Sequence, residues 1–221
     1  MNIKEGIENR FSVRAFTDEV PSMDKIKEIL KMAGSAPSGG NIQPWKVYVL
    51  NKESKKKLAE KTLNNFDTGV QEEIEYEIYP KPLADEYKKR RYECGADMYE
   101  ALSIEKDDLD SRFKQIRENY NFFGAPLGMI ITIDRSFGSN GWGHVGMFLE
   151  NLWLSAIHHG LGLCLQESWS IYPKTVKEVI NHPDNEIVWC GVAIGYEDKN
   201  DPINNYRTKR EELESFVKFV E

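Results

Sequence analysis

Apolar and polar positions follow clear periods along the first fifty residues. Residues 2–10 predict a short helix. A second helix is predicted between Ser22, a suitable N-cap, and Gly34, a suitable terminator. Residues 35–41 are rich in Ser, Pro, Gly and Asn and predict a loop, and residues 45–50, rich in aromatic and β-branched side chains, predict a strand. The apolar positions that give the second helix its period are Ile26, Ile29, Leu30 and Ala33.

The rest of the chain continues to mix helical and strand periods. Residues 70–95 are polar and irregular and carry a basic run at residues 88–91. We interpret this stretch as an excursion from one domain and not as a second domain. A long helix with one apolar face is predicted over residues 143–159. Further helices are predicted over residues 52–63, 96–121 and 172–180, and further strands over 127–133, 161–165 and 187–195.

These elements favour one α+β domain spanning residues 1–221, with an excursion at about 70–95. Helices and strands do not alternate strictly as βαβ units, so a doubly wound sheet is disfavoured. A chain of 221 residues is long enough to bury a substantial core. Residues 1–6 lack the apolar block of a signal peptide, and no apolar run approaches the roughly 18–20 residues of a membrane span. We therefore expect a cytoplasmic protein without a membrane partner.

Charge and cysteine content narrow the partners further. The chain has 29 Lys and Arg against 36 Asp and Glu, a formal net charge of -7, and such a field repels nucleic acid and anionic lipid. It does not exclude an anionic ligand held by a local group of arginines. Cys94, Cys164 and Cys190 show no CxxC spacing and are interpreted as reduced, structural thiols.

The segment Arg10-Phe11-Ser12-Val13-Arg14 carries the first candidate chemistry. In an extended chain, Arg10, Ser12 and Arg14 point to one side, opposite Phe11 and Val13. Two guanidinium groups and a hydroxyl on one side suit a phosphate. Spacing alone leaves a solvated strand edge as the alternative.

Three further clusters have both a functional and an ordinary interpretation. The loop Pro37–Trp45 contains small residues that let the backbone approach a flat ligand closely, but it also fits a simple turn before a strand. Gln166-Glu167-Ser168 follows a short strand, where backbone N–H groups emerge. Asn205–Arg210 is a basic island in an acidic tail, and such islands are often solvated.

Taken together in this order, the four clusters resemble the FMN-dependent nitroreductase family, and residues 79–95 resemble its nitroaromatic-reducing branch. The resemblance covers essentially the whole chain. It implies an α+β fold with a central mixed, mainly antiparallel sheet flanked by helices, and an intertwined homodimer. It also implies that the redox chemistry takes place on flavin N5, with no catalytic side chain and no metal ion.

The same resemblance assigns flavin contacts by position. The residues implied to hold the FMN phosphate are Arg10, Ser12 and Arg207, and Arg14 would lie near the N1/O2 edge of the ring. The residues implied to reach the ring from the other subunit are Pro37, Ser38, Gly39 and Asn41, while Glu167 and Ser168 would present backbone groups near N5 and O4. Many relatives have glycine in place of Ser168, so access over that edge is expected to be tighter here.

The function implied is reduction of nitroaromatic or quinone-like acceptors with NADH or NADPH, by a ping-pong hydride shuttle. Two alternatives stay open. One is a reductive dehalogenase of a halogenated aromatic amino acid, for which Glu75, Tyr79 and Lys81 are candidates by residue type alone. The other is a flavin redox carrier that receives electrons from ferredoxin.

Three weaker signals are set aside. The glycines of residues 138–143 do not fit GxGxxG, and we expect a loop connection there. His158 and His159 diverge by about 100° on a helix, which argues against a metal site. Asp107, Asp108 and Asp110 lack the glycine and closing glutamate of an EF-hand and are interpreted as a helix start.

Overall fold

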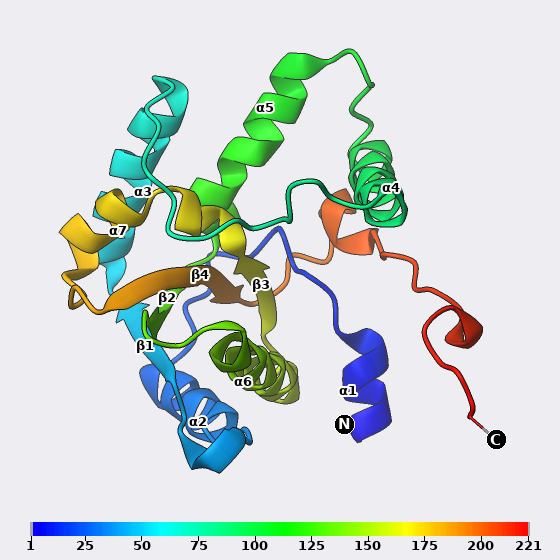
Figure 1. The fold of residues 1–221 in the computed structure, drawn as a ribbon. Coiled ribbons are helices and arrows are strands. Elements are labelled where there is room, and N and C mark those ends of the chain that lie inside the picture. The colour runs from blue at the N-terminus through cyan, green and yellow to red at the C-terminus, as the bar shows by residue number, and fades with distance from the viewer. Residues whose placement is uncertain (1, 221) are drawn as a thin grey trace.

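The computed structural model describes residues 2–220, and their centre is a four-stranded antiparallel sheet (Figure 1). Its strands lie in the order β1-β2-β4-β3, so the two longest strands are central and the two shortest form the edges. Helices cover both faces of the sheet, which confirms the predicted α+β class. The strands are β1 (Trp45–Leu50), β2 (Leu127–Asp134), β3 (Gly162–Gln166) and β4 (Glu186–Gly195).

Two helices cover one face of the sheet and two cover the other. Below the sheet in Figure 1, α2 (Met23–Ala33) and α6 (Ser139–His158) pack against β2 side chains such as Met129 and Ile131. On the opposite face, α3 (Lys52–Asp67) and α7 (Pro173–Ile180) pack with Ile130. Successive strand residues point to opposite faces, so the continuous apolar run of β2 fills both cores.

A buried carboxylate lies where β1, β2 and β4 meet. Glu186, only 7% exposed, accepts hydrogen bonds from Tyr48 Oη (2.8 Å) and from Thr132 Oγ1. Burial, reinforced by Glu186, raises the pKa of Tyr48 to about 12. Tyr48 therefore keeps its proton at physiological pH and remains a donor to this carboxylate.

The predicted helix starts are confirmed where side chains cap them. Asn2 forms a capping box with Glu5 at the start of α1 (Ile3–Asn9), and Ser22 accepts the Lys25 N–H at the start of α2. Asp108 caps α5 (Leu109–Arg117), as the helix-start interpretation of the acidic run predicted. By contrast, the loop predicted over residues 138–143 is wrong, because α6 already begins at Ser139.

The irregular structure predicted through residue 95 is also wrong, because α4 spans Asp85–Ala101. None of its residues is fully buried, so no apolar stripe reveals the helix in the sequence. Ion pairs one turn apart line its surface instead. They join Lys88 to Asp85, Lys89 to Glu93 and Arg90 to Glu86.

Residues 70–84 form an extended strap that leads from α3 to α4 (Figure 1). Three side chains, those of Glu72, Glu75 and Tyr76, fix the strap to the sheet and to α7. Glu72 accepts the N–H of Lys174 (2.7 Å), Glu75 pairs with Arg135 (2.7 Å), and Tyr76 donates to the Trp189 carbonyl. The strap therefore holds α4 and α5 at one end of the molecule.

The two ends of the described chain lie beside the globular body in Figure 1 and expose large apolar side chains. Ile3 of α1 is 79% exposed, and Phe219 in the tail is 86% exposed. Within residues 2–220, no helix combines the length and the apolar character needed to cross a bilayer. The short 3-10 turns are Gly39–Asn41 (η1), Glu118–Gly124 (η2), Glu167–Ile171 (η3), Pro202–Asn205 (η4) and Leu213–Ser215 (η5).

Candidate functional site

The extended segment 10–14 runs alongside β3 in the same direction. Ser12 forms a parallel bridge with Leu163, and the Val13 N–H donates to the Leu163 carbonyl (3.1 Å). Because the two segments are parallel, Arg10 lies toward the start of β3 and Arg14 toward its end. The turn η3, which begins at Glu167, follows directly after that end. The site therefore has a direction, from Arg10 at one end to Arg14 and η3 at the other.

Small residues of β3 allow this close approach. A Cβ added to Gly162 would lie 2.5 Å from Val13 Cγ2, and Val13 is 2% exposed. Ser12 and Arg14 lie instead near Cys164. Burial raises the pKa of the Cys164 thiol, while Arg14 and Ser12 act in the opposite direction. Val13 thus anchors the segment against Gly162, and Ser12 and Arg14 both lie near Cys164.

Aromatic rings position the two outer arginines. The Arg10 guanidinium lies 4.5 Å from the centroid of the Trp153 ring, and that of Arg207 lies 3.4 Å from the Phe11 ring. Phe11, Trp153 and Arg207 line one cavity of about 500 Å³ between the segment and α6. Both cations thus lie against aromatic rings; Arg207 Nη1 also donates to backbone carbonyls of its own segment, and the remaining N–H groups can donate to an anion.

Few carboxylates neutralise these arginines. Within residues 2–220, Arg14 and Arg207 have no carboxylate at ion-pair distance. Arg10 has only a long contact of 3.9 Å to Glu150. In a chain with a net charge of -7, three guanidinium groups with so little neutralisation suit an anionic group such as a phosphate.

Asn204 was missed by sequence reasoning, and it joins the two ends of the chain at this site. Its Oδ1 accepts the Arg14 N–H (2.9 Å), and its Nδ2 donates to the carbonyls of Ala15 and Asp198 (2.8 Å each). Its own carbonyl accepts from Arg207 Nη1 (2.6 Å). In the sequence, the only signal at this place is the basic island that starts one residue later.

Tyr206, which lies in the predicted basic island but was assigned no role, connects this site to α4. Its hydroxyl donates to the Cys94 carbonyl (2.8 Å), and burial raises the pKa of Tyr206 so that it stays protonated. Arg14 acts on the same phenol in the opposite direction, which places the guanidinium nearby. Helix α4 therefore lies close to the Arg14 end of the site.

The η3 turn closes this end of the site. Trp169 is fully buried and stacks on Phe122 with ring centroids 4.5 Å apart, which anchors the turn to the core. Glu167 is exposed, yet the groups around its carboxyl desolvate it and raise its pKa. Ser168 Oγ is buried and has no hydrogen-bond partner within residues 2–220. Seven other side-chain polar atoms of the described residues, including Thr17 Oγ1 and Thr62 Oγ1, are buried without a partner in the same way, so this hydroxyl by itself does not mark a ligand contact.

The loop of residues 37–41 has a defined shape but lies elsewhere. Gly40 and Asn41 have φ angles of 58° and 55°, and the Gly39 N–H donates to His144 Nε2 (3.3 Å). Ser38 Oγ accepts the Gln43 N–H (3.0 Å). Pro37, Gly39 and Asn41 are exposed, so the loop presents small residues outward.

The sheet keeps this loop away from segment 10–14 of the same chain. The loop precedes β1, whereas the segment borders β3, and these strands are opposite edges about 14 Å apart. The two pieces also lie at opposite ends of the strands. Trp45 of β1 pairs with Ile133 at one end of β2, whereas Leu163 of β3 shares the partner Ile194 with Leu127 at the other end of β2. Ile133 and Leu127 are about 20 Å apart along the strand. One chain therefore does not bring both pieces to one planar ligand.

The residues considered for a dehalogenase lid are also dispersed. Glu75 is paired with Arg135, Lys81 with Glu77 (2.8 Å), and Tyr79 lies under the Arg91 guanidinium. Tyr79 and Lys81 line one cavity and Glu75 lines another. The three side chains do not converge on one ligand.

Comparison with known proteins gives a consistent result. The sequence model of the nitroreductase family matches residues 7–196. A 4-nitrobenzoate reductase of Nocardioides sp. (strain LMS-CY) is 33% identical over 97% of this chain and 88% of its own length. A nitrobenzene nitroreductase of Ectopseudomonas oleovorans is 32% identical over 99% of this chain and 96% of its own.

Solved structures agree with these matches. The FMN and NADPH-dependent nitroreductase NfnB from Sphigopyxis sp. strain HMH superposes with a TM-score of 0.96 at 33% identity, covering 100% of both chains. The FMN-dependent nitroreductase NfnB from Mycobacterium smegmatis, solved in complex with NADPH, gives 0.93 at 26% identity, covering 99% of this chain and 97% of that one.

Proposed function

The chain belongs to the nitroreductase family, and we propose that it binds FMN and uses NADPH or NADH to reduce nitroaromatic or quinone-like acceptors. One of the relatives described above is a reductase of 4-nitrobenzoate, which carries a carboxylate, and another is a reductase of nitrobenzene, which is neutral. Both are nearly equally identical to this chain, at 33% and 32%. Two similar structures are of FMN-dependent enzymes, and one of them was solved with NADPH.

The observation that carries the proposal is the parallel course of segment 10–14 and β3. It supports a phosphate at the end where Arg10 and Arg207 lie, with Ser12 as a further donor. It supports a ring at the other end, beside Arg14 and η3.

Bound FMN supplies the hydride and electron transfer. The residues of the chain supply position and electrostatics. Arg14 places a cation at the proposed N1/O2 edge, where negative charge is stabilised. A unit pair about 4 Å apart is worth roughly 4 kcal/mol at an effective dielectric of 20, and less with solvent access. Glu167 and Ser168 present backbone groups at the proposed N5/O4 edge, and no side-chain nucleophile is needed.

We propose that donor and acceptor use one slot in turn. NADPH is expected to bleach the yellow holoenzyme under anaerobic conditions, and 4-nitrobenzoate is expected to restore the colour. Steady-state double-reciprocal plots should then give parallel lines. Stopped-flow absorbance measures both half-reactions. A flavin that stays oxidised with both NADPH and NADH, but bleaches with reduced ferredoxin, would instead identify a protein-fed carrier.

We further propose a homodimer in which Pro37, Ser38, Gly39 and Asn41 of one copy contact the ring held by the other. The diagonal separation of this loop from segment 10–14 supports the proposal, because one chain supplies only half of such a site. The exposed apolar side chains of α1 and of the tail supply surface for a second copy to bury. Location in the cytoplasm is proposed on the two buried thiols, which suit a reducing compartment.

Co-expression of two damaged chains tests the shared site. Arg14→Ala damages the ring end of a site, and Asn41→Glu places a carboxylate in the loop. In a mixed dimer, one site would carry both changes and the other neither. With random pairing, about half of the dimers are mixed, so about a quarter of all sites should be intact. Nitroaromatic turnover measures this fraction. Activity no higher than the mean of the two homodimers would show that each chain builds its own site.

A further inference from the structure

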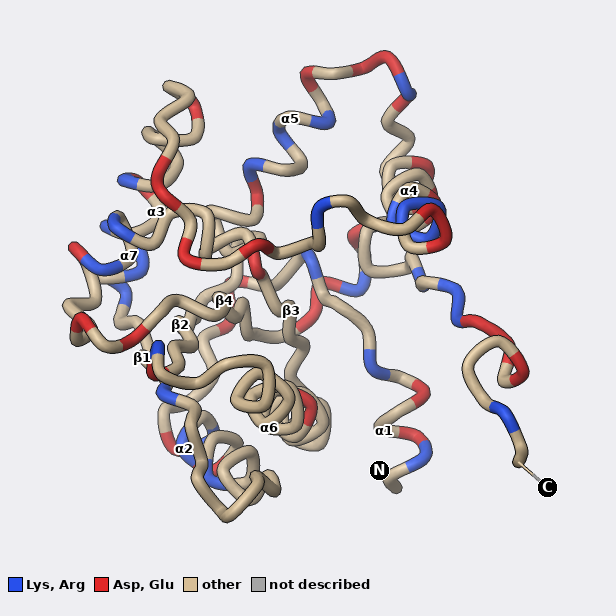
Figure 2. Tube along the Cα trace, in the orientation of Figure 1, with Lys and Arg blue, Asp and Glu red and all other residues tan. Residues whose placement is uncertain are grey.

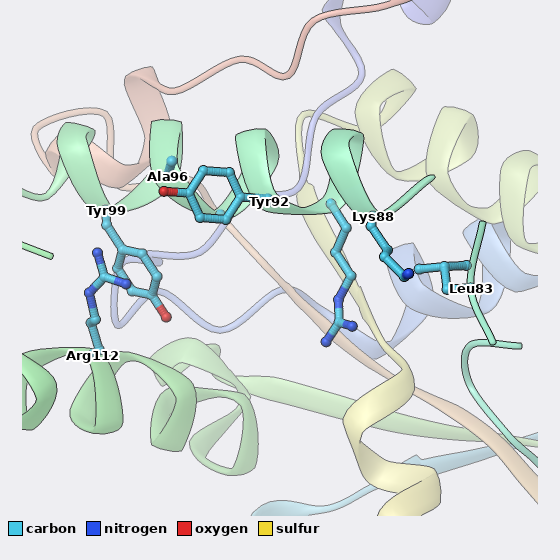
Figure 3. A pocket seen from close by; sticks show the side chains of 8 residues that line it. Leu83, Lys88, Tyr92, Ala96, Tyr99 and Arg112 are labelled. Atoms are coloured by element: carbon cyan, nitrogen blue, oxygen red, sulfur yellow. The ribbon is translucent and has the colours of Figure 1, made fainter. Parts of the chain in front are cut away.

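We propose that the cavity between α4 and α5 binds the carboxylate of an aromatic acceptor, so that the enzyme prefers anionic over neutral nitroaromatics. This inference rests on the proposed function and names the substrate class of the same site. The cavity has a volume of about 330 Å³ and is lined by residues of both helices together with Leu83. Figure 3 shows it from close by.

The lining of this cavity is cationic. Lys88, Arg91 and Arg112 line it, and no Asp or Glu does. Within residues 2–220, neither arginine has a carboxylate at ion-pair distance, whereas Lys88 is paired with Asp85 (2.9 Å). Figure 2 shows the basic stretch of α4 against a chain in which acidic residues predominate. The local field thus attracts an anion although the net charge is negative.

Aromatic rings hold both arginines in place. The Arg91 guanidinium lies 4.3 Å from the centroid of the Tyr79 ring, and that of Arg112 lies 4.2 Å from the Tyr99 ring. Figure 3 shows Arg112, from α5, against Tyr99, from α4. Stacking fixes each guanidinium plane; Arg112 Nε also donates to the Glu105 carbonyl (3.1 Å), and its terminal N–H groups and those of Arg91 are left to donate to a carboxylate. The site is therefore partly organised before a ligand arrives.

The cavity adjoins a second, less polar one that extends to the far end of η3. The second cavity, of about 630 Å³, shares Leu83, Lys88 and Arg91 with the first and is also lined by Tyr76 and Ile171. Its one carboxylate among the described residues, Glu77, is paired with Lys81 (2.8 Å). Ile171 is the last residue of η3. A flat acid with its carboxylate at Arg91 can extend its ring along this wall, so that a group opposite the carboxylate points toward η3.

Two variants of α4 each remove one positive charge, and comparing them separates direct contact of a cation with the carboxylate from the general effect of the charge of α4 on an anionic substrate. Arg91→Gln removes a cation from the cavity wall. Lys89→Gln removes a cation two residues away that is highly exposed, pairs with Glu93 and does not line the cavity. The FMN-loaded proteins are compared with 4-nitrobenzoate and with 4-nitrobenzamide, which has a similar shape but no charge. In Arg91→Gln, the ratio of kcat/KM for the acid to that for the amide should fall about 10-fold, and in Lys89→Gln less than 2-fold.

Equilibrium binding of benzoate and benzamide to the same holoenzymes, by calorimetry, keeps the inference separate from turnover. Benzoate should bind more tightly than benzamide, and Arg91→Gln should remove the difference. If neither nitro compound is reduced but this preference is found, the proposed function fails and the carboxylate site stands. An unchanged acid-to-amide ratio with slower bleaching by NADPH in Arg91→Gln would overturn the inference, because the cation would then serve the donor's phosphate. Equal effects of both variants would overturn it as well.

Discussion

Replacing Arg10 by alanine is expected to weaken FMN binding by about 10- to 150-fold while leaving riboflavin binding nearly unchanged. A charge-assisted hydrogen bond to phosphate contributes about 1.5–3 kcal/mol, and about 1.4 kcal/mol corresponds to a factor of ten. Arg10 is suited to this role because its side chain is only 19% exposed and is stacked on Trp153. Riboflavin lacks the phosphate, so it serves as an internal control for damage to the rest of the site.

Replacing Arg14 instead should have a different signature, because the proposed site runs from a phosphate end to a ring end. Arg14→Ala should weaken FMN and riboflavin by similar factors. It should also lower the two-electron reduction potential by roughly 30–60 mV, if about 1.4–2.8 kcal/mol of stabilisation is lost. Fluorescence titration of the apoproteins and a reductive titration with a reference dye measure the two effects. Equal loss of riboflavin binding in both variants, or an unshifted potential in Arg14→Ala, would contradict the proposed direction of the site.

The strands were predictable because the amino-acid composition of each segment itself indicates that it is buried. The runs that became β2 and β4 are almost continuously apolar, as expected for strands covered on both faces. Helix α2 was predictable because Ser22 caps it and its apolar positions repeat with the helical period. In each case, the feature that forms the element lies within the element itself.

Helix α4 and the start of α6 were not predictable in this way. Helix α4 is stabilised by ion pairs on a solvated surface and by its connection to the strap, so it shows no apolar period. Glycine at positions 138, 141 and 143 suggests a loop, but Gly141 is needed because an added Cβ would lie 2.5 Å from Phe137 Cβ. Close packing, and not loop geometry, explains that glycine.

For the site, the sequence indicated its pieces but not what holds them together. Arg10, Arg14 and Arg207 were singled out from residue type and from the family resemblance, and the structure places them along one path beside β3. Asn204 bonds to backbone groups of residues about 190 positions earlier in the chain, and no local pattern reveals such a contact. The cationic cavity between α4 and α5 was equally hidden, because it depends on two helices meeting.

The largest loss of stability is expected from Gly191→Ala in β4. A Cβ at this position would lie 2.0 Å from Trp169 Cδ1, far inside contact distance. The backbone has little freedom to move away, because Gly191 is paired with Ile130 on one side and with Gln166 on the other. Trp169 must therefore leave its fully buried place, which we expect to cost about 3–5 kcal/mol.

This variant also tests whether the proposed ring end depends on the core beneath it. Displacing Trp169 moves η3, so Gly191→Ala should lose FMN as well as stability, measured by urea unfolding and by flavin content. Gly95→Ala is a matched control, because the added Cβ would meet no atom within 4 Å beyond its chain neighbours and the backbone of α4, and alanine favours a helix by up to about 1 kcal/mol. In a Trp169→Ala background, the clash is absent and Gly191→Ala should cost little. If the cost persists there, strain in β4 itself, and not contact with Trp169, would be its cause.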